Sequence, residues 1–195
     1  MSHYFRTDTT QDLVETLELA HEFLNQCEDD GRYWKWFIHA MHSATQSTAS
    51  LALENGNGFL VQKPGVAQSM LRAHTNNSSP VSPHMDNFIK LIRKSLDKAN
   101  LRGSAVPLED DGHTAALESL DELRDGFTHF NVKSWSVEIM FILDLSSIAA
   151  SYIEHYTVST PAILWHDEAH QNIAATAVRD LKSLIAQRCT KCSIK

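Results

Sequence analysis

The sequence predicts an all-α protein, an up-and-down bundle of five to six helices that forms one domain over residues 1–195. Apolar residues recur at spacings of three and four along most of the chain, and this spacing places them on one face of a helix. Glycine (7) and proline (5) are scarce, whereas an all-β chain needs many turn-forming residues. With 43% hydrophobic and 21% charged residues, a chain of this length can bury a core and stay dissolved in water.

Two helices are predicted in the N-terminal part of the chain. The first covers residues 9–29 and is followed by Gly31, which can adopt the backbone conformation found after helix ends. The second covers residues 32–54, and small residues in its second half allow a neighbouring helix to approach closely. The apolar faces consist of Leu13, Leu17, Ala20, Leu24 and Cys27 in the first helix, and of Trp34, Ile38, Met41, Thr45, Thr48 and Leu51 in the second.

Residues 55–83 show no clear helical period. Turn-forming residues lie at both ends of the segment, and a structureless loop of this length is uncommon inside a compact domain. We therefore expect either a packed excursion that contains a short helix over residues 66–73 or a mobile flap.

The rest of the chain is predicted to be helical apart from short connections. Pro83 is tolerated in the first turn of a helix, and Ser136 can cap a later helix whose residues are apolar nearly all round, so that helix should be the most buried. The predicted helices cover residues 83–100, 113–130, 137–156 and 167–188.

Charge and cysteine content limit the class of protein. The net charge of −7 argues against a protein that coats long nucleic acids, although it leaves room for a small basic site. Three cysteines, Cys27, Cys189 and Cys192, favour a reducing compartment over a disulfide framework. The N-terminal residues lack the apolar run of a signal peptide, and no stretch approaches the ~20 apolar residues of a membrane span. We expect a cytoplasmic protein that does not associate with membranes.

The segment "LRDGFTHF" contains the strongest candidate site, formed by Arg124, Asp125 and His129. On an ideal helix Asp125 and His129 share a face that points away from the core, and Asp125 can accept a hydrogen bond from the His129 ring and raise its basicity. Arg124 lies at the edge of the apolar face, about 140° around the helix from His129. Arg124 and His129 can therefore meet only if the helix distorts near Gly126 or if two copies of the chain pair.

These three residues resemble the motif of HEPN domains, which is an Arg, a polar residue, a few further residues and then a His. The flanking sequence "LRDGFTHFNVKSWSVE" is also similar to segments of uncharacterised bacterial HEPN-like proteins. The resemblance implies an all-α bundle, a homodimer that brings two copies of the motif together, and metal-independent RNA cleavage without a cofactor. It further implies a toxin or defence system, with RNA or an antitoxin-type protein as partner.

The implied chemistry is consistent with the residue types. The 2′-hydroxyl of RNA is an internal nucleophile, so the enzyme has only to move protons and stabilise charge. His129 would act as general acid or base, Arg124 would bind the phosphate through two hydrogen bonds, and Asp125 would orient His129. Lys133 and Trp135 would bind the substrate, although Trp135 also fits simple packing at a helix junction.

Two other functions remain open on the sequence alone. One is a non-catalytic HEPN-like module that binds a protein partner or a nucleotide through the same surface. The other is a purely structural bundle in which Arg124 pairs with Asp121 or Glu118. Whether the protein is an enzyme is therefore left to experiment.

Three further His and Cys patterns are better explained by structure than by metal binding. His39 and His42 lie three residues apart without a third ligand at suitable spacing. "HDEAH" at residues 166–170 lacks the Glu that directly follows the first His in zinc proteases. "CTKC" at residues 189–192 is a single pair near the chain end, where we expect a frayed tail.

Overall fold

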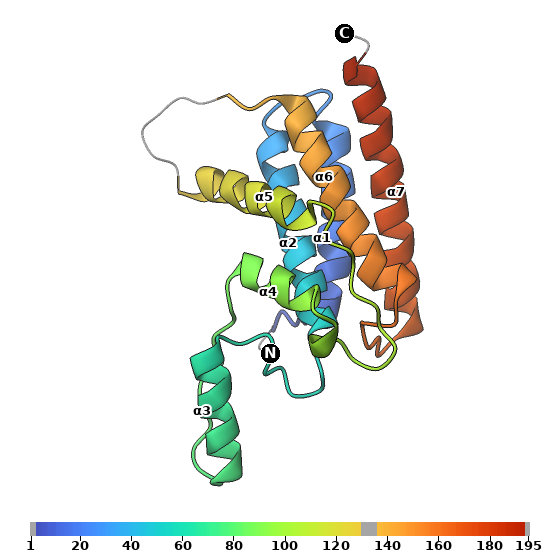
Figure 1. Ribbon diagram of the computed structural model, residues 1–195. Helices are drawn as coiled ribbons and strands as arrows, with labels where there is room; N and C mark the ends of the chain where they lie inside the picture. Colours follow the sequence, from blue (N-terminus) through green and yellow to red (C-terminus); the bar gives the residue numbers. More distant parts are fainter. Residues whose placement is uncertain (1–2, 130–135, 194–195) are drawn as a thin grey trace.

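The computed structural model describes residues 3–129 and 136–193, and these residues confirm the predicted all-α class. They form seven α-helices and contain no β-strand. Four long helices run along the molecule, and α5 crosses them (Figure 1). The bounds of these five are α1 (Thr9–Gln26), α2 (Tyr33–Ala52), α5 (His113–Thr128), α6 (Ile139–Glu154) and α7 (Glu168–Ser193).

Helix α2 is the centre of the bundle. It packs against α1, α5 and α6, and also against the short helix α4 (Phe88–Ser95). Phe37, Ile38 and Met41 on α2 are fully buried. The small residues predicted to allow close approach are buried too, among them Ala44 and Ala49. Because α2 contacts helices on several sides, its polar residues can face buried partners from distant parts of the chain.

Helix α4 is much shorter than the helix predicted over residues 83–100, so that prediction was wrong at both ends. At the C-terminal end, α4 stops at Ser95, and a separate 3₁₀ turn follows (η1, Lys98–Asn100). The residues that precede α4 are extended and pair with residues 61–63: the Lys63 amide donates to the His84 carbonyl at 3.0 Å, and the Asp86 amide donates to the Val61 carbonyl at 2.9 Å. Asn87 then caps α4 by accepting a hydrogen bond from the Lys90 amide. The His84 carbonyl and the Asp86 amide therefore bond to residues 61–63, so they are not available for the hydrogen bonds of a longer helix.

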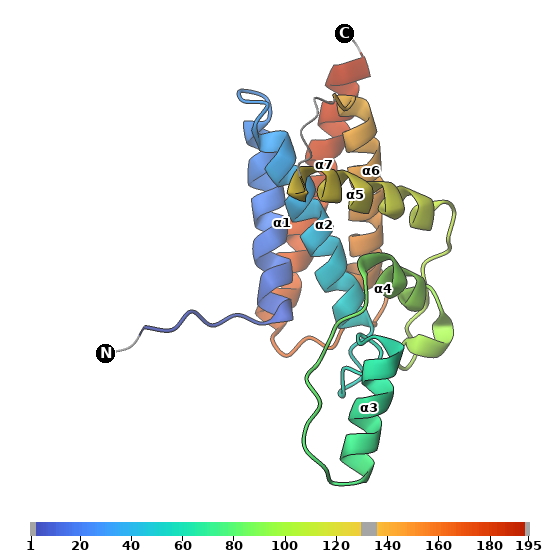
Figure 2. The same ribbon diagram turned by 90° about the vertical axis from the view of Figure 1, so that its left-hand side faces the viewer.

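A helix, α3 (Pro64–Thr75), lies within the segment that had no clear period. It projects away from the bundle in both views (Figures 1 and 2). It makes no contact with any other described helix.

Helix α6 begins later than expected, and Ser136 does not cap it. Glu138 occupies the N-cap position, and the helix ends in a π-helical turn (η2, His155–Ser159). Two buried tyrosines join this end of α6 to α4: the Tyr152 hydroxyl lies 2.6 Å from the Ser95 hydroxyl, and the Tyr156 hydroxyl donates to the Ser95 carbonyl at 2.8 Å. These hydrogen bonds fix α4 against the bundle.

Helix α7 extends beyond the predicted end at residue 188. Cys189 and Cys192 therefore lie in its last turns and not in a frayed tail. Among the described helices, none combines the length and the apolar character that crossing a membrane requires.

Candidate functional site

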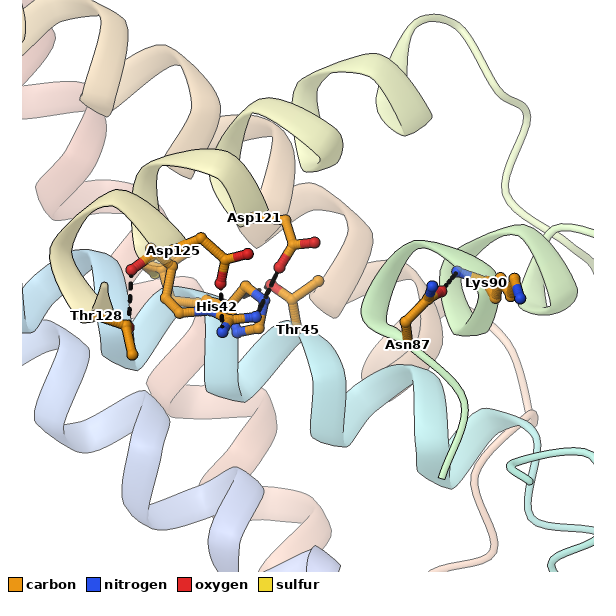
Figure 3. Close-up of polar contacts among 9 residues, drawn as sticks. His42, Thr45, Asn87, Lys90, Asp121, Asp125 and Thr128 are labelled. Atoms are coloured by element: carbon orange, nitrogen blue, oxygen red, sulfur yellow. Dashed lines mark hydrogen bonds and ion pairs between the residues drawn. The ribbon is translucent and has the colours of Figure 1, made fainter. Parts of the chain in front are cut away.

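Arg124 lies in a polar cluster between α2 and α5, which we call the α2/α5 cluster and define as His42, Asp121, Arg124 and Asp125. Arg124 Nη2 donates to Asp121 Oδ1 at 2.7 Å, and its Nη1 lies 2.7 Å from Asp125 Oδ1. His42 Nε2 lies 2.8 Å from the same Asp121 oxygen. Figure 3 shows His42 of α2 facing Asp121 and Asp125 on α5. The cluster thus joins two helices whose residues are about 80 positions apart in the sequence.

His42 is buried and neutral. Its ring stacks on Phe88 with centroids 4.1 Å apart. Burial lowers the pKa of His42 to about 4 and the Arg124 cation lowers it as well, while the hydrogen bond to Asp121 opposes both effects. A carboxylate only accepts hydrogen bonds, so the neutral ring must carry its proton on Nε2 and donate to Asp121. The 2.9 Å separation between Arg124 Nη2 and His42 Nε2 is then a close contact around a shared acceptor.

Two carboxylates hold Arg124 in place. The Arg124 and Asp121 side chains are about one quarter exposed (26% and 25%), whereas Asp125 is 53% exposed. The inner pair with Asp121 is therefore shielded from water, and the outer pair with Asp125 is open to solvent and to competing anions. Arg124 Nε is buried, and the structure describes no hydrogen-bond partner for it. Asp121 thus orients the Arg124 guanidinium, and the exposed Asp125 carboxylate covers its outer nitrogen, Nη1.

His129 lies directly after the last residue of α5 and is exposed. Its amide donates to the Asp125 carbonyl at 2.8 Å. The expected hydrogen bond between the Asp125 carboxylate and the His129 ring is replaced by the pairing of Asp125 with Arg124. The helix also stays regular through Gly126, so the distortion that would bring Arg124 and His129 together within one chain does not occur.

The remaining predicted site residues, Lys133 and Trp135, lie outside the described residues. The structure therefore brings together Arg124 and Asp125 from the predicted set, and it leaves His129 at the end of the same helix.

Asp121 was expected next to Arg124 only in the purely structural alternative, and that pairing is present. His42 and His39 were not expected near Arg124. The pKa of His39 is lowered by burial, by Lys35 and by Arg124, so the field of the Arg124 cation reaches this half-buried ring. The spacing of three between His39 and His42 indicated that both lie on one side of α2. Nothing local indicated that this side faces α5.

The two His residues of the segment at residues 166–170 lie around the start of α7. His166 is exposed ahead of α7, and His170 Nδ1 lies 3.8 Å from Asp167 within the first turn. Across residues 3–129 and 136–193, no group of three or more His, Cys, Asp or Glu side chains is arranged to hold a metal ion.

The α2/α5 cluster combines an oriented Arg with a neutral, buried His, and the exposed His129 follows at the end of α5. An oriented guanidinium can bind a phosphate, and an exposed imidazole can transfer protons near neutral pH. Comparison of the chain with family models, with curated proteins and with solved structures gives no match.

Proposed function

We propose that the protein is a HEPN-like, metal-independent endoribonuclease that acts as a homodimer, with Arg124 and His129 at the site of cleavage. The observation that carries the proposal is the placement of an oriented Arg and an exposed His at the end of one regular helix. The structure describes no contact between these two side chains within one chain, so the proposal requires a second copy of the chain. Two α5 ends, one from each protomer, would supply an Arg and a His to a shared phosphate.

In the proposed reaction the 2′-oxygen of a ribose attacks the adjacent phosphorus and the bond from phosphorus to the 5′-oxygen breaks. One His129 side chain of the dimer takes the proton from the 2′-hydroxyl, and the other supplies a proton to the 5′-oxygen. The products are a 2′,3′-cyclic phosphate and a 5′-hydroxyl. Arg124 offsets the charge that develops on the phosphate oxygens.

Asp125 would act on Arg124 in this scheme and not on His129. Its carboxylate is exposed and pairs with the outer nitrogen of Arg124, and exposed ion pairs are weak. A phosphate can therefore displace Asp125, while the shielded Asp121 keeps Arg124 oriented. Lys133 and Trp135, which follow His129 in the sequence, are proposed to bind the RNA, and a toxin or defence role with a protein partner belongs to the same proposal.

A non-catalytic HEPN-like module is the second candidate, and the pairing of Arg124 with two carboxylates favours it. An Arg that pairs with both Asp121 and Asp125 already has a structural role, because it neutralises the charge of both side chains between two helices. In that case the same surface would bind a protein or a nucleotide without cleaving RNA.

RNA cleavage by three proteins, measured with EDTA present, separates these functions. The wild type should cleave, and His129→Ala should be slower by about 10²–10⁴-fold, the usual contribution of a general acid or base. His166→Ala is the matched control, because His166 is also exposed but lies ahead of α7; it should cleave like the wild type. Cleavage that survives in His129→Ala, or no cleavage by the wild type, would rule out the proposed site. Light scattering should also report a mass of two chains.

A further inference from the structure

Residues 55–85, which we call the α3 arm, pack against the core only at their base, through Leu60 and Val61, and helix α3 extends from the bundle. Helix α3 contacts no other described helix, and Ala73 is its one buried residue. Leu71 is 51% exposed on the same helix. A 12-residue helix that buries so little is only marginally stable by itself. Helix α3 therefore contributes little to the free energy of folding. Its exposed position outside the bundle (Figures 1 and 2) leaves it available to a binding partner.

The base of the α3 arm is held firmly even though its tip is free. Lys94 of α4 donates to the carbonyls of Leu60 and Gln62 at 2.8 and 3.0 Å. The same ammonium lies 3.0 Å from the carboxylate of Asp86, whose side chain is 1% exposed. Further along, the Ser78 amide donates to the Ala73 carbonyl and turns the chain back. The arm is thus a supported projection, about 18 Å long over α3.

The α3 arm differs from the rest of the protein in charge. It contains no Asp or Glu, although the whole chain has 24 of them, and about four would be expected in a segment of this length. It carries Lys63, Arg72, His74 and His84, and all four side chains are exposed, with Lys63 Nζ 2.8 Å from His84 Nε2. A cationic arm on a protein of net charge −7 is complementary to a polyanion.

Cations continue from the α3 arm towards Arg124. Lys90 and Arg93 of α4 are 58% and 61% exposed, and Arg93 pairs with Glu118 on α5. Figure 3 shows Lys90 on α4, which lies next to the α5 segment that carries Asp121. Helix α4 also packs directly against α5. Exposed cations therefore occur on the arm and on α4, whereas Arg124 is the one Lys or Arg of α5 and is paired with Asp121 and Asp125.

We propose that the α3 arm binds the phosphate backbone of single-stranded RNA and holds the strand that leads to the α5 site. This inference rests on the proposed ribonuclease function for the identity of its ligand. Lys and Arg side chains bind phosphates without regard to sequence. A single strand can bend along the path from α3 over α4 to α5, which a rigid duplex cannot follow as easily.

Binding of a fluorescein-labelled oligouridine, measured by anisotropy in the His129→Ala background, tests the arm without interference from cleavage. The double variant Lys63→Gln/Arg72→Gln should weaken binding on the order of tenfold at low salt. It should also reduce the slope of log K against log salt by about 1.4, from the loss of two phosphate contacts. Arg179→Gln/Lys191→Gln is the control, since it removes two exposed cations from α7, which contacts neither α4 nor α5, and it should leave the slope unchanged.

Thermal unfolding of Lys63→Gln/Arg72→Gln should give the wild-type midpoint, because α3 contacts no other described helix. An unchanged salt slope in Lys63→Gln/Arg72→Gln, or no RNA binding by the parent protein, would overturn the α3 arm as an RNA site. Displacement of the RNA by polyglutamate at equal charge concentration would also overturn it and identify an acidic protein as the partner.

Failure of the arm and failure of the ribonuclease give different results. Cleavage that depends on His129 but has an unchanged KM in the arm variant would exclude the arm alone. Binding that depends on Lys63 and Arg72, without any cleavage, would exclude the proposed reaction alone.

Discussion

The protonation of His42 should make the stability of this protein fall as the solution becomes acidic. The side chain is 7% exposed and its pKa is lowered from 6.5 to about 4, chiefly by burial and by the nearby Arg124 cation. The folded state therefore keeps His42 neutral at pH values where the unfolded chain already binds a proton. Because the unfolded state then binds more protons, acid favours unfolding between pH 6.5 and about 4.

The size of this effect follows from the two pKa values. Lowering the pH from about 7.5 to about 5 should reduce the free energy of unfolding by roughly 2 kcal/mol through His42 alone. Asp121 limits the effect, since its hydrogen bond to Nε2 favours the protonated ring. The stability that His42 contributes is complete above pH 6.5 and is lost as the pH falls towards 4.

Urea denaturation of wild type and His42→Gln at both pH values measures this contribution. The Gln amide can donate to Asp121 as Nε2 does, but it does not titrate, so the difference between the two pH values should be about 2 kcal/mol smaller in His42→Gln. Any loss of stability common to both pH values, such as the lost stacking on Phe88, cancels from this difference.

His166→Gln is the control for histidine removal, because His166 is exposed, and it should keep the wild-type response to pH. Equal pH responses in the wild type and in His42→Gln would refute the conclusion that His42 is a neutral, buried partner of Asp121.

Two further predictions concern the core and the cysteines. Ser95→Ala removes the hydroxyl that hydrogen-bonds the buried Tyr152 and should lower the free energy of unfolding in urea by about 1–3 kcal/mol. The control Ser69→Ala, at an exposed position of α3, should change it by less than about 0.5 kcal/mol. Equal losses in the two variants would contradict a stabilising role of the hydrogen bond between Ser95 and Tyr152. Burial raises the pKa of Cys27 to about 12, so mass spectrometry after iodoacetamide treatment of the native protein at pH 8 should find Cys27 modified more slowly than the half-buried Cys192, and faster modification of Cys27 would contradict its buried position.

The helical faces were predictable because helical spacing is a local property of the sequence. Leu13, Leu17 and Leu24 recur at intervals that place them on one face, and all three are fully buried in the structure. The end of α5 was also close to its predicted place, because His129 directly follows the last helical residue. Helix ends that depend on distant contacts were less accurate. The start of α4 is displaced by the antiparallel contact between Gln62 and Met85, which no helical pattern contains.

The candidate site was likewise predictable in its local features and not in its contacts. Its position at the end of α5 and the neighbours Arg124 and Asp125 could be inferred from a few adjacent residues. The predicted hydrogen bond between Asp125 and His129 was wrong. It was inferred from the spacing of the two residues on an isolated helix, whereas Asp125 pairs with the Arg124 cation. An ion pair between adjacent residues competes directly with a hydrogen bond one turn away, and side-chain rotamers decide between them.

The sequence by itself determined the all-α class, the buried face of each long helix and the Arg124–His129 segment at the end of one of them. Only the tertiary structure decided that Arg124 shares Asp121 with His42, 82 residues earlier in the chain, and that α3 contacts none of the other described helices. The physical reason is that helix formation and amphipathic spacing depend on residues three or four positions apart, whereas partners across helices depend on how the apolar faces pack. Packing turned His42 from an ordinary histidine into a buried, neutral donor, and it left the cationic α3 arm exposed.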